Sequence, residues 1–388
     1  MTRTSASGVC VSGALAAALW LAPAAGCGAD GPKGARADSA SPPARDAETA
    51  DTADDGPWHR GIDYRLEWRG FPVMGRGAAP DFARYLDGGL VAFKDSSNNL
   101  TILEDDTGRV RWGYRLGDPL ELWLGVARVD DTLVAGGQTE VLLFDIRDGK
   151  LLDRQQLRGL ANTPPVVIDG NAIFGGSDGK VLAHNLTVGF REWAYQLDGA
   201  ITARPVRMNS ETVGVVSQGG EVIILGADEG DSMGRRDRIF AGLANDPVTD
   251  GRTLYVASLD QSVWAFALED ARLLWRVRTE DRISAQPAVH AGRVYVYVPR
   301  EGLLALNAGT GDRVWSAPDV DGEVVGKRGE ELLVWDGSSI TTLSAESGEV
   351  RTEVAVPGVV SVFTSGFEGG ALYSVDPSGR VSKFISAY

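Results

Sequence analysis

Short apolar strands alternate with glycine-containing turns along most of this chain, and the pattern repeats at intervals of about 40 residues. Its clearest copy is residues 292–315, where valines alternate with tyrosines over residues 294–298 and a leucine-rich stretch follows at residues 303–306. A period of two and a high content of β-branched and aromatic residues predict strands. With an entering strand at residues 286–290 and a further strand from Arg313 on, the pattern predicts units of four antiparallel strands.

The unit recurs throughout the chain. Its apolar strand and turn are found at residues 100–108, 141–149, 181–189, 222–230, 263–271, 303–311 and 340–348, and a shorter last copy is found at 371–384. A proline opens the entering strand at Pro165, Pro205, Pro247 and Pro287, where a missing ladder hydrogen bond costs least. Four short strands per repeat and no helical periodicity predict an all-β fold, an eight-bladed β-propeller of four-stranded antiparallel blades, with seven blades as the alternative.

The two ends of the repeat array are both incomplete. The last copy stops after its third strand, whereas residues 62–68 form a strand-like segment that precedes the first copy and ends in Trp68. We predict that this segment pairs with residues 380–385 and completes the last blade. The pairing closes the ring and removes two open sheet edges that would otherwise invite aggregation.

A tryptophan follows the turn in several copies. These residues are Trp112, Trp193, Trp275 and Trp315, whereas Asp153 and Thr352 stand at the same place in two other copies. A short aliphatic strand, an Asp or Asn and then Thr-Gly-x-x-x-Trp, as at residues 310–315, resembles the pyrroloquinoline-quinone-type propeller repeat, over roughly residues 62–388. The resemblance implies that these tryptophans and Trp68 are structural residues, which lie on outer strands and pack between neighbouring blades.

The first 57 residues follow a different pattern. An apolar run at residues 9–25 ends in Ala-Ala-Gly before Cys27, which predicts a lipoprotein signal peptide over residues 1–26 and lipidation of Cys27. An ordinary secretory signal is the alternative, and either one exports the protein. Residues 27–57 contain no aliphatic side chain larger than alanine, so we predict a disordered, acidic tether before a propeller at residues 58–388. With this leader, the chain is similar to the BamB-type outer-membrane assembly lipoproteins.

Charge and cysteine content limit the possible chemistry. A net charge of −15 argues against nucleic acid as a partner and against binding to anionic lipid head groups, which leaves the lipid anchor as the membrane contact. The two cysteines are Cys10 and Cys27, so the propeller has no counterpart of the vicinal cysteine pair that quinoprotein dehydrogenases carry beneath their cofactor. The histidines at 59, 184 and 290 are scattered. We therefore expect no catalytic residues, no cofactor and no metal.

Two functions of different classes remain. The resemblance to BamB-type proteins implies a non-enzymatic envelope lipoprotein whose propeller is a scaffold for protein binding in outer-membrane protein assembly. Its partners would then be other envelope proteins, and it would be anchored in the outer membrane facing the periplasm. The alternative is a quinoprotein-like enzyme, or a ligand-binding propeller, with its site at the central channel.

Lipidation gives the first test. Cys27 should become the acylated amino terminus of the mature protein, and Gly28, which follows it, is not the aspartate that retains some lipoproteins in the inner membrane. Mass spectrometry of the natively expressed protein should find acyl chains on Cys27. A free amino terminus at Cys27, or at a later residue, would remove the anchor.

Overall fold

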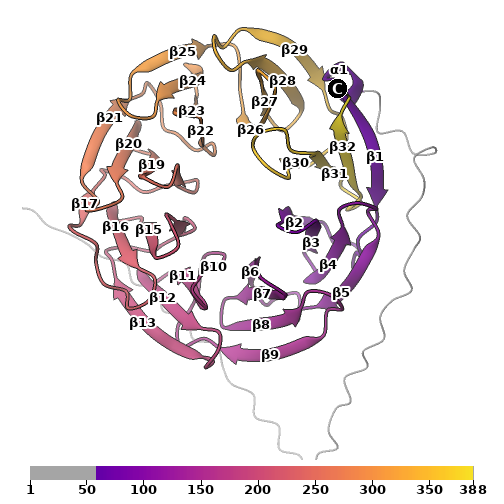
Figure 1. Cartoon of the computed structure of the whole chain (residues 1–388), viewed down its shortest axis with the longest axis vertical. Helices are drawn as coiled ribbons and strands as arrows, with labels where there is room; N and C mark the ends of the chain where they lie inside the picture. Colours follow the sequence, from indigo (N-terminus) through magenta and orange to yellow (C-terminus); the bar gives the residue numbers. More distant parts are fainter. Residues whose placement is uncertain (1–57, 388) are drawn as a thin grey trace, which may run out of the picture. The chain divides into compact units, whose positions relative to one another are not determined.

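The computed structural model describes residues 58–387, which form eight four-stranded antiparallel sheets arranged as the blades of a ring (Figure 1). The prediction of an eight-bladed propeller is therefore confirmed, and the seven-bladed alternative is wrong. The predicted signal peptide, the tether and Cys27 lie outside the described residues. Among residues 58–387, no helix is long and apolar enough to cross a membrane.

The first strand of each blade borders the central channel and the fourth lies at the outer rim (Figure 1). Blades 1 and 2 consist of β2 (Pro80–Leu86), β3 (Leu90–Asp95), β4 (Asn99–Glu104) and β5 (Val110–Arg115), then β6 (Trp123–Val129), β7 (Thr132–Gly137), β8 (Glu140–Asp145) and β9 (Leu151–Gln156). Blades 3 and 4 consist of β10 (Val166–Ile168), β11 (Asn171–Gly175), β12 (Lys180–Asn185) and β13 (Phe190–Gln196), then β14 (Val206–Arg207), β15 (Thr212–Val216), β16 (Glu221–Gly226) and β17 (Asp237–Arg238).

The remaining blades follow the same plan. Blades 5 and 6 consist of β18 (Val248–Thr249), β19 (Thr253–Ser258), β20 (Ser262–Ala267) and β21 (Leu273–Arg278), then β22 (Ala288–His290), β23 (Arg293–Val298), β24 (Gly302–Asn307) and β25 (Arg313–Ala317). Blade 7 consists of β26 (Glu323–Arg328), β27 (Glu331–Trp335), β28 (Ser339–Ser344) and β29 (Val350–Ala355). Blade 8 consists of β30 (Ser361–Thr364), β31 (Leu372–Val375), β32 (Val381–Ser386) and β1 (Tyr64–Gly70).

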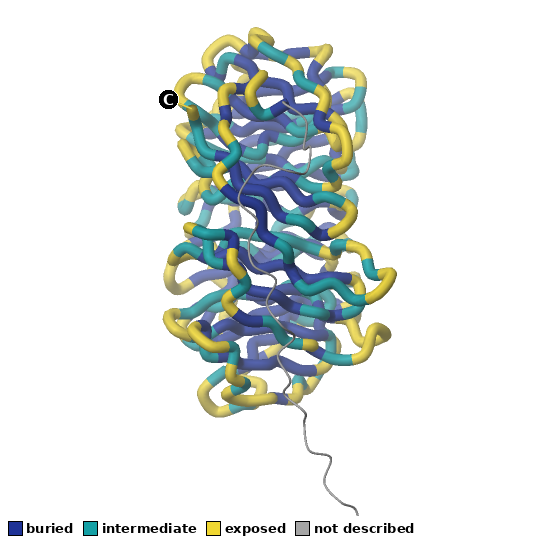
Figure 2. The backbone as a smooth tube through the Cα atoms, turned by 90° about the vertical axis from the view of Figure 1, so that its right-hand side faces the viewer, coloured by how far each residue is buried: buried dark blue, intermediate teal, exposed yellow. Residues whose placement is uncertain are grey.

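Burial explains the apolar pattern of the sequence. Middle strands such as β3 and β20 are buried at every residue because a neighbouring blade covers each of their faces. Outer strands are covered on one face only, and in β13 the one buried residue is Trp193. Seen from the side, buried residues fill the middle of the ring, whereas exposed residues lie in the turns along its two faces (Figure 2). The hydrophobic core therefore lies between the blades rather than at the ring's centre.

The ring closes through its first and last strands. β1 pairs antiparallel with β32, from Tyr64 opposite Ser386 to Gly70 opposite Val381, with an irregularity between Leu66 and Trp68. This confirms the predicted closure, although β1 begins and ends two residues later than the predicted segment. The pairing joins segments about 320 residues apart. The entropic cost of closing so long a loop is moderate, because it grows only slowly with loop length.

A buried lysine reinforces this closure. The ammonium group of Lys383 on β32 lies 3.0 Å from the carboxylate of Glu67 on β1 and 3.0 Å from that of Asp105, in the turn after β4 of blade 1. Burial alone would lower the pKa of Lys383, but its hydrogen bonds to Glu67 and Asp105 outweigh burial and raise this pKa. Lys383 therefore stays charged and connects the last blade to the first.

A single helical turn, α1 (Trp58–Gly61), precedes β1 and was not expected from the sequence. Trp58 is buried against Phe384, with the ring centroids 4.8 Å apart, in a cluster that also contains Ile340 and Val356. Four residues are too few to show helical periodicity. The helix covers apolar residues of blades 7 and 8 at the outer rim.

Removal of the closing strand should destabilise the ring. A chain that begins at Gly70 lacks Glu67 and Trp68 and leaves the edge of β32 unpaired, so we expect a lower denaturation midpoint or aggregation. A chain that begins at Pro57 keeps all of α1 and β1 and is the matched control. Denaturant titration and size-exclusion chromatography compare the two, and equal behaviour would show that the closure contributes little.

Candidate functional site

The predicted structural tryptophans all lie at the seams between blades. Each is buried on an outer strand, and its indole nitrogen donates a hydrogen bond to the carbonyl of the first residue after the third strand of the next blade. The pairs are Trp112 with Ile146 (2.9 Å), Trp193 with Ala227 (3.0 Å), Trp275 with Ala308 (3.0 Å), Trp315 with Ala345 (3.1 Å) and, across the ring closure, Trp68 with Asp105 (2.7 Å). Trp68 thus makes the same contact as the repeat tryptophans.

Each indole ring also covers the turn glycine of the next blade. At Gly348, φ is +75° and a Cβ atom would lie 2.6 Å from the ring of Trp315. At Gly108, φ is +68° and a Cβ atom would lie 2.4 Å from the ring of Trp68. These glycines are thus required both by backbone conformation and by contact with the ring. This explains why Thr-Gly and Trp recur together in the repeat.

The blade 2 copy, which lacks the tryptophan, uses another contact. In blade 2, Asp153 occupies the tryptophan position, but nearby Gln155 donates a hydrogen bond of 2.8 Å to the carbonyl of Leu186, which is the equivalent acceptor in blade 3. Buried His184 contacts the side-chain oxygen of Gln155 at 2.9 Å, and burial lowers the pKa of this histidine. His184 therefore belongs to a seam. Among the described residues, no group of three or more His, Cys, Asp or Glu side chains is placed to hold a metal.

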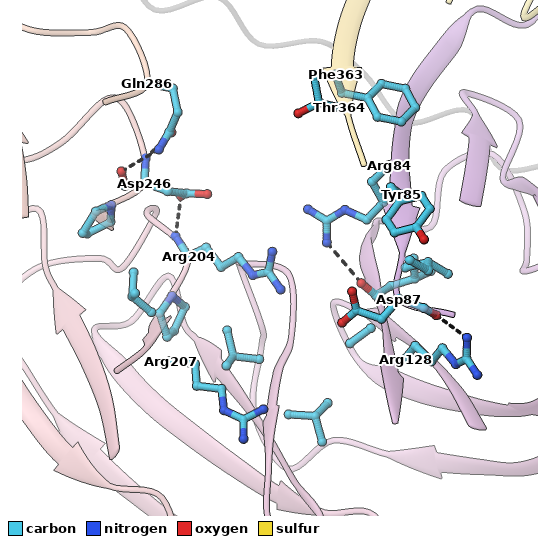
Figure 3. Close-up of a pocket in the computed structure, with 18 residues that line it drawn as sticks. Arg84, Tyr85, Asp87, Arg128, Arg204, Arg207, Asp246, Gln286, Phe363 and Thr364 are labelled. Atoms are coloured by element: carbon cyan, nitrogen blue, oxygen red, sulfur yellow. Dashed lines mark hydrogen bonds between the residues drawn. The ribbon is translucent and has the colours of Figure 1, made fainter. Parts of the chain in front are cut away.

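The central channel, where the ligand-binding alternative places its site, contains a cavity of about 650 Å³. Arg84 of β2 and Arg204, just before β14, point into it from opposite sides (Figure 3). The guanidinium group of Arg84 donates to the carbonyl of Val126 at 3.2 Å, and that of Arg204 donates to the carbonyl of Pro165 at 3.2 Å. Both acceptors are neutral carbonyl oxygens.

Burial and like charge perturb these arginines. Burial lowers the pKa of Arg84, and the charge of Asp246 opposes this effect. Burial and the nearby charge of Arg84 together lower the pKa of Arg204 to about 10, again against Asp246. Both groups stay charged near neutral pH. The perturbation shows that two positive charges lie close together in a partly dehydrated place.

An apolar surface lies on one face of the ring. Strands alternate in direction within a blade, so the loops after its second and fourth strands leave from the same face. Leu120 and Leu122, in the loop between β5 and β6, are 95% and 57% exposed, and Leu160, between β9 and β10, is 51% exposed. The backbone of Gln138 bridges the two loops by accepting from Ala161 at 2.9 Å and donating to Leu122 at 2.8 Å. We call Leu120, Leu122 and Leu160 the apolar loop cluster.

A small hollow adjoins the apolar loop cluster. Its volume is about 210 Å³, and Leu120, Leu122 and Trp123 are among the residues that line it. The indole nitrogen of Trp123 is buried and has no hydrogen-bond partner among the described residues. Unlike the seam tryptophans, Trp123 begins an inner strand, β6. This N–H is therefore shielded from the surface, and the exposed apolar side chains at the hollow are the leucines.

The fold and the seam contacts define the class of the protein. Eight four-stranded blades, with an indole-to-turn contact at five of their seams, form a β-propeller of pyrroloquinoline-quinone-type repeats. The family model described as outer membrane protein assembly factor BamB matches residues 120–237 and 218–381, more than half of the chain. The chain therefore belongs to this family, as its repeats predicted.

Individual relatives are more distant. An outer membrane protein assembly factor BamB from Bordetella pertussis (strain Tohama I) is 28% identical over 233 residues, which are 58% of this chain and 58% of that protein. Another, from Burkholderia pseudomallei (strain K96243), is 26% identical over 136 residues, 35% of this chain and 34% of that protein. The chain thus spans just over half the length of the first relative and about a third of the second.

Solved structures share the fold. The crystal structure of BamB from Moraxella catarrhalis has a TM-score of 0.62 and 15% identity, over 79% of this chain and 99% of that one. The computationally designed Ika8 protein has a TM-score of 0.66 and 12% identity, over 83% of this chain and 100% of that one. At these identities the similarity concerns the fold, since a designed protein and a natural assembly factor share it equally.

A tryptophan substitution tests the seam contact. Trp315→Ala should lower the free energy of unfolding by about 3–5 kcal/mol, because it leaves a cavity over Gly348. Trp315→Phe keeps a ring but loses the donor to Ala345, and should cost roughly 1 kcal/mol beyond its packing loss. Denaturant titration measures both, with exposed Leu152→Ala on outer strand β9 as the control. A midpoint for Trp315→Ala equal to that of the control would mean that the indole is not a packing residue.

Proposed function

We propose that this protein is a non-enzymatic scaffold of the bacterial envelope that acts in outer-membrane protein assembly. In this proposal the lipid on Cys27 anchors it to the outer membrane on the periplasmic side, and the propeller binds other proteins of the assembly machinery. Membership in the BamB family supports this function. The named relatives are outer membrane protein assembly factors.

The proposed docking site for these proteins rests on the exposure of the apolar loop cluster. Leu120, Leu122 and Leu160 are exposed and belong to neighbouring loops whose backbones are held together through Gln138. A clustered apolar surface on a soluble domain is a feature of protein interaction sites. A few well-packed, fully desolvated residues near the centre of an interface supply most of its binding free energy.

The adjoining hollow indicates the chemistry of the partner. The exposed leucines would be covered by aliphatic side chains of the partner. An extended peptide segment presents such side chains on one side at every second residue along its length. We therefore propose that an extended segment of an assembly-machinery protein binds at the apolar loop cluster.

Two features argue against the quinoprotein-like alternative. No cysteine follows Cys27, so the propeller cannot supply a vicinal cysteine pair beneath a quinone. The described histidines also belong to separate elements: His59 to α1, His184 to β12 and His290 to β22. Neither feature bears on binding of a small ligand without catalysis.

Replacement of the three cluster leucines by serine tests the docking site. The variant Leu120→Ser/Leu122→Ser/Leu160→Ser should recover about tenfold less of the outer-membrane assembly proteins after cross-linking of the natively expressed protein, because a combined loss of about 1.4 kcal/mol from three interface side chains weakens a complex tenfold. Mass spectrometry of the cross-linked complexes identifies and quantifies these proteins.

A matched variant controls for the loss of exposed apolar area. Leu152→Ser/Val188→Ser/Val314→Ser removes side chains that are 52%, 54% and 44% exposed and lie outside the apolar loop cluster. It should recover the assembly proteins at the wild-type level. Equal recovery from both variants would place the docking site elsewhere, and recovery of no assembly protein with wild type would contradict the proposed function itself.

A further inference from the structure

The central cavity differs in charge from the chain as a whole. The chain carries a net charge of −15, yet arginines outnumber aspartates around the cavity. Its charged lining residues are Arg84, Arg128, Arg204, Arg207, Asp87 and Asp246. Arg128 donates to the backbone carbonyls of Asp87 and Asp130 and not to a carboxylate. The cavity is therefore a positive site within an acidic protein.

The two inward-pointing arginines have no ionic partner within the described chain. None of the ion pairs among residues 58–387 includes Arg84 or Arg204. A guanidinium group has five N–H donors, and the single hydrogen bonds to Val126 and Pro165 leave most of them unused. In Arg204 the Nε–H is buried and has no partner in the part of the chain that the structure describes.

The nearest candidate counter-charge is already engaged. Asp246 accepts a hydrogen bond of 2.7 Å from the backbone N–H of Arg204, and its own backbone N–H donates to the side chain of Gln286 at 3.0 Å. These bonds fix the aspartate beside the backbone of Arg204 and not against its guanidinium group (Figure 3). One carboxylate also cannot neutralise two arginines. A buried donor and a buried charge left without a partner are both costly.

We propose that the central channel binds a small, doubly charged oxyanion between Arg84 and Arg204. Planar guanidinium groups pair with carboxylate or phosphate oxygens through two parallel hydrogen bonds, so opposed arginines can each hold one such group. The cavity is larger than an inorganic anion needs, and it also contains apolar side chains such as Val166 and Phe363. A small organic ligand that carries carboxylate or phosphate groups fits this lining. This site is independent of the apolar loop cluster and of the scaffold role.

Isothermal titration calorimetry on the natively folded protein tests the site. Inorganic phosphate and succinate are titrated separately at low ionic strength, because screening by salt weakens an electrostatic site. Binding of either anion at about one molecule per protein supports the proposal. Comparison of the two affinities shows whether the site prefers a phosphoryl group or a dicarboxylate. Absence of binding by both anions to the wild-type protein would overturn it without reference to any variant.

Variants assign the binding to these residues. Arg84→Gln and Arg204→Gln should each weaken binding about tenfold or more, since each loses a charged pair, and the double variant should bind neither anion. Arg351→Gln is the matched control, because it removes the same charge from the outer strand β29, where Arg351 is paired with Glu349. Its affinity should match that of wild type. Equal weakening by all three single substitutions would show a general charge effect and contradict the proposal.

Folding of the variants is checked by thermal unfolding without ligand. If a glutamine variant does not fold, Arg84→Lys and Arg204→Lys keep the charge but lose the two-pronged donor geometry, and they should bind more weakly than wild type. Thermal unfolding with ligand gives a further readout, because a ligand that binds only the folded protein raises the midpoint of thermal unfolding. Millimolar succinate should raise the midpoint of wild type and of Arg351→Gln, and not that of the double glutamine variant. The same rise in all of them would overturn the assignment.

Discussion

The contact between an outer-strand tryptophan and the next blade's turn is the interaction on which the ring depends. A four-stranded blade is too small to bury its own apolar faces, so its stability comes from its neighbours. The indole ring covers the turn glycine and donates to the carbonyl beside it, which fixes both the spacing and the relative height of two blades. The same contact at Trp68 joins the first blade to the last. This repeated contact therefore sets the relative placement of neighbouring blades at five of the eight seams.

Two exceptions show what this contact requires. Ala271 adopts a φ of 54° at the position where other turns have glycine, and it is fully buried. The preceding blade ends in the short strand β17, which supplies no tryptophan, so no ring crowds the alanine Cβ. At Gly189 the side chain of Gln155 takes the place of the ring. A methyl group is thus tolerated in this turn where the indole is missing, and the glycine–tryptophan pair is one structural unit.

Much of the fold was predictable because its causes are local. Strand periodicity, turn glycines and the entering prolines all act within one repeat, and the unpaired ends predicted the closure at Trp68.

The short helix α1 was missed because its tertiary contacts, centred on Trp58, determine it. The channel arginines were missed because Arg84 belongs to blade 1 and Arg204 to the entry of blade 4, and only the closed ring brings these two side chains to one cavity. An arginine directly before an entering proline, as at Arg204, was the one signal available. In the sequence, Leu120 and Leu160 are ordinary loop residues 40 positions apart. Only the folded structure places their two loops side by side.

The order of strands in blade 8 has a mechanical consequence. β1 is the outermost strand of blade 8 and is also the strand that follows α1 directly in the chain. A pull on α1 is transmitted first to the hydrogen bonds between β1 and β32, beginning at Tyr64 and Ser386. Every other blade is continuous in sequence and carries this load only after the closure has opened. The strand pair that completes the ring is thus the first to carry such a load, and the salt-bridged Lys383, which lies opposite Trp68, resists its opening further along the strand.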